Sequence, residues 1–279
     1  MKNILSTTKT IFLALWIAGA VACSDEGSND GPANPNTQNN NGGSDDGAGG
    51  NTGTGGSLAR FTIVGDFFYA ISNTELMTYE LGPEGALTER ARQNVGQGVE
   101  TMFPYQGQLL LGSRNGVFVY DLSNPATPQR IGAYERITSC DPIVARDGMA
   151  FSTLRSGDVG CDRGVNRLEV LELPEGGGDP VLKSTYGELE QPKGLGIKDN
   201  ILYVCDGDRG VIIFDVSEVY DGDDDYAVEE MDAIPGFEAS DVIVQDELLL
   251  VIAVDGLRQY DISQARTPRP LSTIPVNAQ

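Results

Sequence analysis

Five copies of one pattern fill the sequence after residue 57. In each copy a run of alternating apolar residues ends in an acid and is followed by a turn; these acids are Glu80, Asp121, Glu172, Asp215 and Asp261. Successive acids are 41 to 51 residues apart. Alternation with a period of two residues predicts β-strands. A repeat of this length predicts an architecture of stacked copies.

Three more strand-like stretches surround the run in each copy. In the second copy they are ETMFPY, LLLGS and PQRIGAYE, which short turns separate from one another and from VFVYDL. Four short strands in roughly 44 residues are typical of a propeller blade. An open sheet of twenty strands is excluded, because twist limits open sheets to about ten strands.

We therefore predict an all-β fold, a β-propeller of five four-stranded blades. A six-bladed propeller with one degenerate copy, or another all-β arrangement, is the alternative. The predicted repeats cover approximately residues 58–97, 98–138, 139–190, 191–237 and 238–279.

The sequences around three of the acids resemble those of a known family. The stretches YDLSNPATP, DGDRGVIIFDVS and YDISQARTP, in the second, fourth and fifth copies, resemble the LVIVD-repeat family of bacterial surface propellers. The first and third copies match this family poorly. The resemblance implies a propeller displayed on a bacterial surface, and its motifs include no catalytic residues.

The N-terminus is typical of a secretory signal. Lys2 and Lys9 precede an apolar run at residues 11–23, which ends in small residues. This run is too short to span a bilayer, which needs about 20 apolar residues. We predict that residues 1–22 are a signal peptide.

Residues 20–23, AVAC, resemble the lipobox of bacterial lipoproteins, although the usual motif has Leu where this chain has Ala20. The resemblance implies that Cys23 carries lipid, palmitate included, and becomes the new N-terminus. The serine that follows implies delivery to the outer membrane of a bacterial cell envelope. Ordinary signal cleavage, which would leave Cys23 as a free thiol, is the alternative.

Residues 23–57 join this anchor to the repeats and are rich in Gly, Asn, Ser and Asp. A segment with so little apolar surface cannot recover its ordering entropy, so we expect a disordered tether. Its mean end-to-end distance would be roughly 30 Å. That distance would hold a folded domain clear of the lipid.

The charge balance excludes several functions. The chain has 19 basic and 41 acidic residues and no histidine, and after residue 57 the net charge is −19. Such an acidic surface repels nucleic acid, so we expect no nucleic-acid partner. Without histidine the chain cannot build a Ser-His-Asp or Cys-His site, and it lacks the commonest zinc ligand.

Meander topology places three cysteines on one face of the predicted propeller. Cys140 begins the innermost strand of the third blade, and Cys161 lies in an enlarged loop between that blade's second and third strands. We predict a disulfide between them, in an oxidising compartment. Cys205 ends a strand of the fourth blade on the same face, so a Cys161–Cys205 pairing stays open.

The same face is the predicted ligand-binding face, because long loops on a rigid scaffold commonly carry binding residues. Carboxylates and cations that converge there can bind a sugar through its hydroxyls, or a cation. The candidates are Glu100, Asp141, Lys193 and Asp241 at the starts of innermost strands, with Arg155, Asp162 and Arg163 in the enlarged loop. We assign no catalytic residue.

On the opposite face, residues 221–225 (DGDDD) form an acidic run. Calcium prefers several oxygen ligands, but this run lacks the spacing and the terminal glutamate of an EF-hand. We therefore favour an acidic, solvated loop. We predict no metal or cofactor, with calcium as a weak alternative.

These features together predict a binding or scaffold module. We expect it to be held to the membrane by N-terminal lipid, exposed at the surface or in the periplasm, with a protein or glycan partner. The alternative is a glycan-active enzyme that uses two carboxylates, Glu100 with Asp141 or Asp241.

Overall fold

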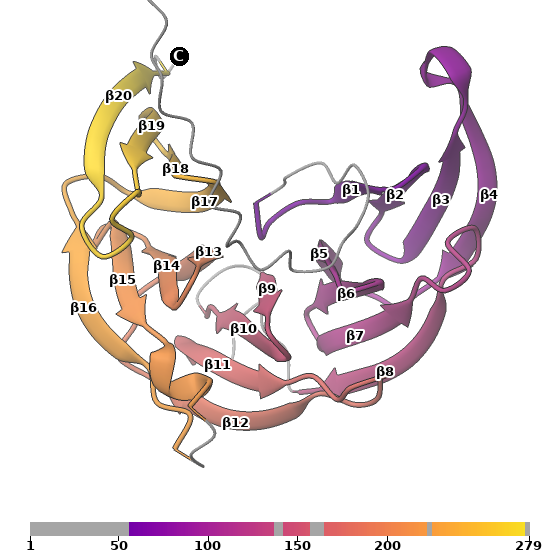
Figure 1. Cartoon of the computed structure of the whole chain (residues 1–279), viewed down its shortest axis with the longest axis horizontal. Helices are drawn as coiled ribbons and strands as arrows, with labels where there is room; N and C mark the ends of the chain where they lie inside the picture. Colours follow the sequence, from indigo (N-terminus) through magenta and orange to yellow (C-terminus); the bar gives the residue numbers. More distant parts are fainter. Residues whose placement is uncertain (1–55, 137–141, 157–164, 222–224, 277–279) are drawn as a thin grey trace, which may run out of the picture. The chain divides into compact units, whose positions relative to one another are not determined.

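The computed structural model describes residues 56–136, 142–156, 165–221 and 225–276. All the described strands belong to one compact unit. Five four-stranded antiparallel sheets follow one another in sequence and are arranged as a five-bladed β-propeller (Figure 1). The predicted fold class and blade number are confirmed.

Each blade is an antiparallel meander from the innermost to the outermost strand. Blade 1 contains β1 (Phe61–Val64), β2 (Phe67–Ile71), β3 (Glu75–Leu81) and β4 (Leu87–Asn94). Blade 2 contains β5 (Val99–Tyr105), β6 (Gln108–Ser113), β7 (Gly116–Asp121) and β8 (Gln129–Glu135). Blade 3 contains β9 (Ile143–Arg146), β10 (Met149–Leu154), β11 (Arg167–Glu172) and β12 (Val181–Tyr186). Blade 4 contains β13 (Pro192–Lys198), β14 (Ile201–Asp206), β15 (Val211–Asp215) and β16 (Glu229–Ile234). Blade 5 contains β17 (Ala239–Gln245), β18 (Leu248–Ala253), β19 (Gly256–Asp261) and β20 (Arg269–Pro275).

A tight turn joins the first two strands of every blade. The first turn residue has a positive φ in all five blades: Gly65, Gln106, Asp147, Asp199 and Asp246. Two-residue hairpins of this geometry match the right-handed twist of the strands. The short polar turns predicted from the sequence are therefore the turns that the structure contains.

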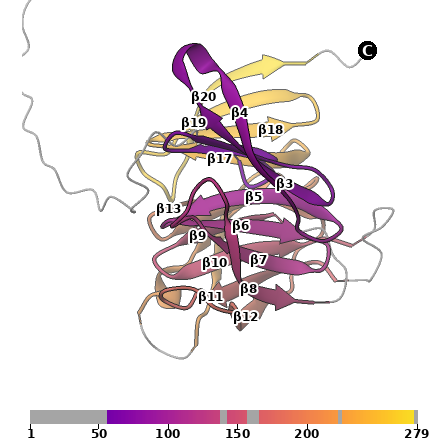
Figure 2. The ribbon, with the colours of Figure 1, turned by 90° about the vertical axis from the view of Figure 1, so that its right-hand side faces the viewer.

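Four apolar cores lie between consecutive blades. In the core between blades 3 and 4, Phe151 and Phe214 are completely buried, and burying one such side chain stabilises the fold by about 1.5–3 kcal/mol. The middle strands of blades 2, 3 and 4 are covered on both faces, which explains their nearly continuous apolar sequences. Figure 2 shows the strands of blade 2 from the side, in order from β5 to β8.

The recurring acids stabilise the following turn in three blades. Asp121, Asp215 and Asp261 each accept a hydrogen bond from the backbone N–H of the serine two residues later. The two glutamates instead reach cations on the outermost strand, Glu80 pairing with Arg90 and Glu172 with Lys183. The longer side chain extends past the turn, so it stabilises the blade edge and not the turn.

Candidate functional site

A pocket of about 200 Å³ lies where the innermost strands begin. It is on the face that carries the connections between second and third strands. Residues from the entry segment and from blades 2, 3, 4 and 5 line it: Leu58, Glu100, Thr101, Pro142, Arg155, Pro192, Lys193 and Ser240. Three of the residues predicted to bind a ligand, Glu100, Arg155 and Lys193, are thus brought together.

A recurring β-bulge explains which residues reach this pocket. The pairing between the first two strands shifts between Val99 and Thr101 in blade 2, between Pro192 and Leu195 in blade 4, and between Ala239 and Asp241 in blade 5. A bulge inserts an unpaired residue and re-aims its side chain. Glu100, Lys193 and Ser240 occupy these bulges, and all three line the pocket.

The charged pocket residues are held in place by partners outside the pocket. Arg114 Nε donates to Glu100 Oε1 at 2.7 Å, and Lys193 Nζ donates to Glu238 Oε1 at 2.7 Å. These ion pairs restrict the rotamers of both side chains. The pocket therefore presents one carboxylate and one ammonium in fixed positions, and Arg155 also lines it.

Asp241, the fourth described candidate, is not among the residues that line the pocket. Its carboxylate accepts hydrogen bonds from Ser57 Oγ at 3.2 Å and from its neighbour's backbone, Val242 N, at 2.9 Å. The residue is only 7% exposed, and burial raises the pKa of its carboxyl to about 6. The sequence placed Asp241 beside Glu100 and Lys193, whereas Ser240 is their structural equivalent.

Close backbone approach to this carboxylate requires glycine at two positions. A Cβ at Gly56 would lie 2.3 Å from Asp241 Oδ2, and a Cβ at Gly194 would lie 2.0 Å from Asp241 Oδ1. No real Cβ tolerates such contacts without movement of the neighbouring atoms. The entry segment, blade 4 and blade 5 therefore pack tightly around Asp241.

Ser57 is a structural residue that the sequence pattern did not indicate. It lies at the end of the predicted tether, yet it is 1% exposed. Its hydroxyl donates to Asp241 and accepts from Leu195 N at 2.7 Å, so it connects blades 4 and 5. Two residues later, Ala59 O accepts from Met102 N of blade 2 at 2.8 Å. The segment from Ser57 to Ala59 thus contacts blades 2, 4 and 5, and Leu58 within it lines the pocket.

Several predicted residues lie outside the described residues: Cys23, Cys140, Asp141, Cys161, Asp162 and Arg163. The enlarged loop itself is confirmed, since residues 155–166 separate β10 from β11 whereas two to four residues join the equivalent strands elsewhere. Cys205 is a free thiol, completely buried in β14. Burial raises the pKa of this thiol well above its usual value.

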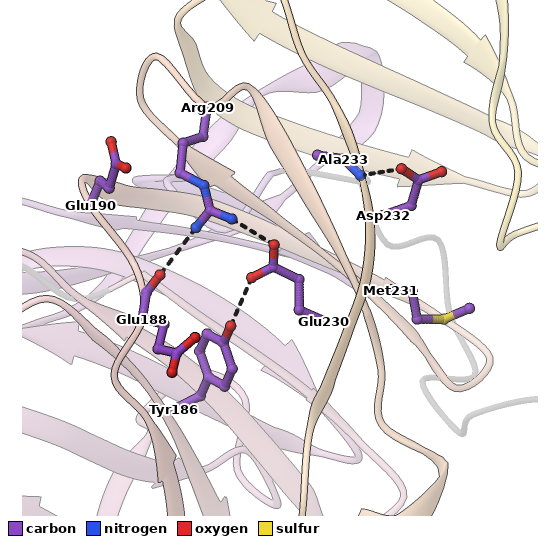
Figure 3. A pocket seen from close by; sticks show the side chains of 8 residues that line it. All are labelled: Tyr186, Glu188, Glu190, Arg209, Glu230, Met231, Asp232 and Ala233. Atoms are coloured by element: carbon purple, nitrogen blue, oxygen red, sulfur yellow. Dashed lines mark hydrogen bonds and ion pairs between the residues drawn. The ribbon is translucent and has the colours of Figure 1, made fainter.

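A larger polar groove of about 700 Å³ lies between blades 3 and 4 (Figure 3). Its lining residues are Tyr186, Glu188, Glu190, Arg209, Glu230, Met231, Asp232 and Ala233. Glu230 accepts hydrogen bonds from Tyr186 Oη at 2.7 Å and from Arg209 Nη2 at 2.5 Å. Burial, and then the bond to Glu230, raise the pKa of Tyr186.

Arg209 makes further hydrogen bonds within the groove. Arg209 Nη1 also donates to the backbone oxygen of Glu188 at 3.0 Å. The sequence around Arg209, DGDRG, reads as a turn, and the backbone does turn there, with positive φ at Gly207 and Gly210. The sequence did not indicate that the arginine in this turn would bond the segment that connects blades 3 and 4.

Among the described residues, no group of three or more acids or cysteines is arranged to hold a metal ion. The acidic run at 221–225 falls partly outside that part of the chain, since residues 222–224 are not described. No helix within the described ranges has the length and apolar character needed to cross a bilayer.

No protein-family model matches the chain, and no curated protein matches it. Solved structures do resemble it. A putative 6-phosphogluconolactonase from Bacteroides fragilis aligns over 77% of this chain and 69% of its own length, with a TM-score of 0.58 and 11% sequence identity. The periplasmic gluconolactonase of Pseudomonas aeruginosa aligns over 78% and 68%, with a TM-score of 0.57 and 16% identity.

The computationally designed Ika8 protein aligns over 77% of this chain at 14% identity, with a TM-score of 0.53. This chain spans only 60% of the length of that protein. One fold hosts many unrelated functions, and identities this low carry no information on the site. The comparisons therefore show that the chain has a β-propeller fold.

Proposed function

We propose that the chain is a binding module that holds a glycan at the pocket where its innermost strands begin. The observation that carries this proposal is the convergence of Glu100, Arg155 and Lys193 on one small concavity. A carboxylate accepts hydrogen bonds and the two cations donate them, which is the combination that sugar hydroxyls need. The volume of about 200 Å³ is below the range of drug-sized sites, so the pocket suits a single sugar unit at a chain end.

Display on a membrane completes this proposal. The basic start, apolar run and small residues before Cys23 support secretion and lipid attachment at that cysteine, followed by delivery to the outer membrane. The tether would then hold the propeller clear of the lipid. The unaltered chain should incorporate labelled palmitate and stay in the membrane fraction. A Cys23→Ser variant should incorporate no palmitate and should be lost from the membrane fraction.

A glycan-cleaving enzyme is a weaker account of the same pocket. Hydrolysis needs two carboxylates across the bond, about 5–5.5 Å apart for retention and about 6.5–9.5 Å for inversion. Of the two described candidates, Glu100 lines the pocket, but Asp241 is turned toward Ser57 and accepts its hydrogen bonds there. The described part of the pocket is therefore better suited to binding.

The test is a calorimetric titration of the full chain with monosaccharides and with oligosaccharides released from the producing cell's envelope. Lys193→Met should weaken binding of the best sugar about tenfold, the effect of losing one charged hydrogen bond. Lys198→Met is a matched control, because Lys198 ends the same strand and its ammonium bonds Asp246 O at 2.6 Å, away from the pocket. Binding that is unchanged by Lys193→Met, or no sugar binding at all, would contradict the proposal.

A further inference from the structure

Blade 5 has an apolar face that none of the other described strands covers. One face of this blade, including Leu249 and Val251, is buried against blade 4. On the other face, Ile243 pairs across strands with Leu250, Ile252 pairs with Leu257, and Leu257 pairs with Ile274. Ile252 is 42% exposed, and the other four are partly or well exposed. This set is the aliphatic face of blade 5.

Blade 1 also has a face that the other described strands leave uncovered, and its side chains are aromatic. Its inner side chains, including Tyr69 and Leu76, are buried against blade 2. The opposite face carries Phe61, Phe68 and Tyr79, whose ring centroids are 5.8 and 6.2 Å apart in succession. Phe61 is 62% exposed. These three rings form the aromatic face of blade 1.

The equivalent faces of the other blades are covered. The second strand of blade 4, ILYVCD, is buried at every residue, whereas the second strand of blade 5, LLLVIA, is just as apolar but buried at alternate residues. Strands with such continuous apolar sequences are normally covered on both faces. Large exposed apolar patches on a soluble domain mark interaction sites.

The two uncovered faces belong to the two ends of the row of blades. Consecutive blades pack through their inner strands, but no comparably extensive contact joins blade 5 to blade 1 among the described strands. These blades stand opposite each other in Figure 1, and both lie at the same end of the view in Figure 2.

We propose that a short antiparallel β-sheet from a second, basic protein docks between the aliphatic face of blade 5 and the aromatic face of blade 1. Every established blade interface in this chain is sheet against sheet. An inserted sheet with two apolar faces continues that packing on both sides, at the usual sheet spacing of about 10 Å.

The net charge of the chain indicates which kind of protein supplies the docked sheet. After residue 57 the chain has a net charge of −19, and a second copy carries the same charge, so like-charge repulsion opposes self-association. A basic partner meets an acidic surface and associates faster and more selectively. The tether of this chain cannot supply the sheet, because residues 24–57 contain almost no apolar side chains.

The test introduces a photo-crosslinking amino acid at Phe61 or at Ile252 in the full chain, in the cell that produces it. Val181 is the matched control, since it is 47% exposed but lies on the outermost strand of blade 3. Crosslinks from both positions should map to one sequence of alternating apolar residues in a basic protein. Where both fall in one strand, they should lie on residues of opposite parity, because the two faces alternate along a strand.

A substitution on the aliphatic face of blade 5 tests whether the two faces bind the same sheet. Ile252→Asp places a charge on the aliphatic face, and it should reduce the crosslink from Phe61 about tenfold or more, since burial of an unpaired charge is costly. Val181→Asp should leave that crosslink unchanged. A crosslink between position 252 and blade 1 of the same chain, a crosslinked dimer of this chain, a partner sequence without alternation, or yields no higher than at Val181 would each overturn the proposal.

Discussion

The buried carboxyl of Asp241 makes a prediction about how stability depends on pH. Burial raises the pKa of this group from an ordinary value of 3.8 to about 6. Between these two values the folded chain binds the proton more tightly than the unfolded chain. By linkage, the contribution of this group to the free energy of unfolding falls as the pH rises from about 4 to about 6, and it is flat outside that window.

The size of the effect follows from the shift. One pKa unit corresponds to 1.36 kcal/mol, so a shift of about two units corresponds to about 3 kcal/mol. Asp241 is 7% exposed, and therefore solvent screening reduces this figure little. An Asp241→Asn variant keeps an acceptor for Ser57 and for Val242 N, but it does not ionise.

The assay is urea unfolding of the full chain and of Asp241→Asn at half-unit steps from pH 3.5 to pH 8. The difference between their free energies of unfolding cancels the titration of the other acids. It should change by about 3 kcal/mol across the window, with the asparagine variant relatively more stable at high pH. A difference that does not vary with pH, or that favours the wild type as the pH rises, would refute this account of Asp241.

Three further predictions concern buried residues. Gly194→Ala should lower the free energy of unfolding by about 1–3 kcal/mol, because its Cβ would meet the Asp241 carboxylate, whereas Gly187→Ala, with no atom within 4 Å, should be nearly neutral in the same urea titration. Glu169→Gln should cost about 3–5 kcal/mol, since it removes the charge of a completely buried carboxylate that pairs with the buried Arg136 and the partly exposed Arg167. A loss equal to that of an exposed glutamate would count against this. Cys205 should be alkylated at least about a hundredfold more slowly in the native chain than in urea, because burial raises its pKa. Mass spectrometry of the modified peptide measures both rates, and equal rates would contradict this prediction.

The fold could be predicted from the sequence because the relevant signals are local and repeated. Each blade carries its own alternation and its own turn, so a weak match in one copy is supported by the other four. The enlarged loop of blade 3 and the grouping of Glu100 with Lys193 followed from the same reasoning, since meander topology alone places the strand starts on one face.

The details of the site depend on non-local geometry. A bulge at the start of β17 shifts the parity of the strand, so Ser240 and not Asp241 reaches the pocket. Ser57 has the composition of its tether but becomes buried through contacts with residues more than a hundred positions away. Neither the register shift nor the burial leaves a signal in the pattern of apolar residues.

The most direct test of the proposed binding site uses the three lysines that follow residue 57, which are Lys183, Lys193 and Lys198. Reductive methylation with ¹³C labels each ammonium without removing its charge, and each gives a resolved NMR signal. Titration with the best-binding envelope oligosaccharide should shift the signal of Lys193 and leave the other two in place. Shifts at Lys183 or Lys198 in its stead, or no shift at saturating sugar, would contradict a glycan site at this pocket.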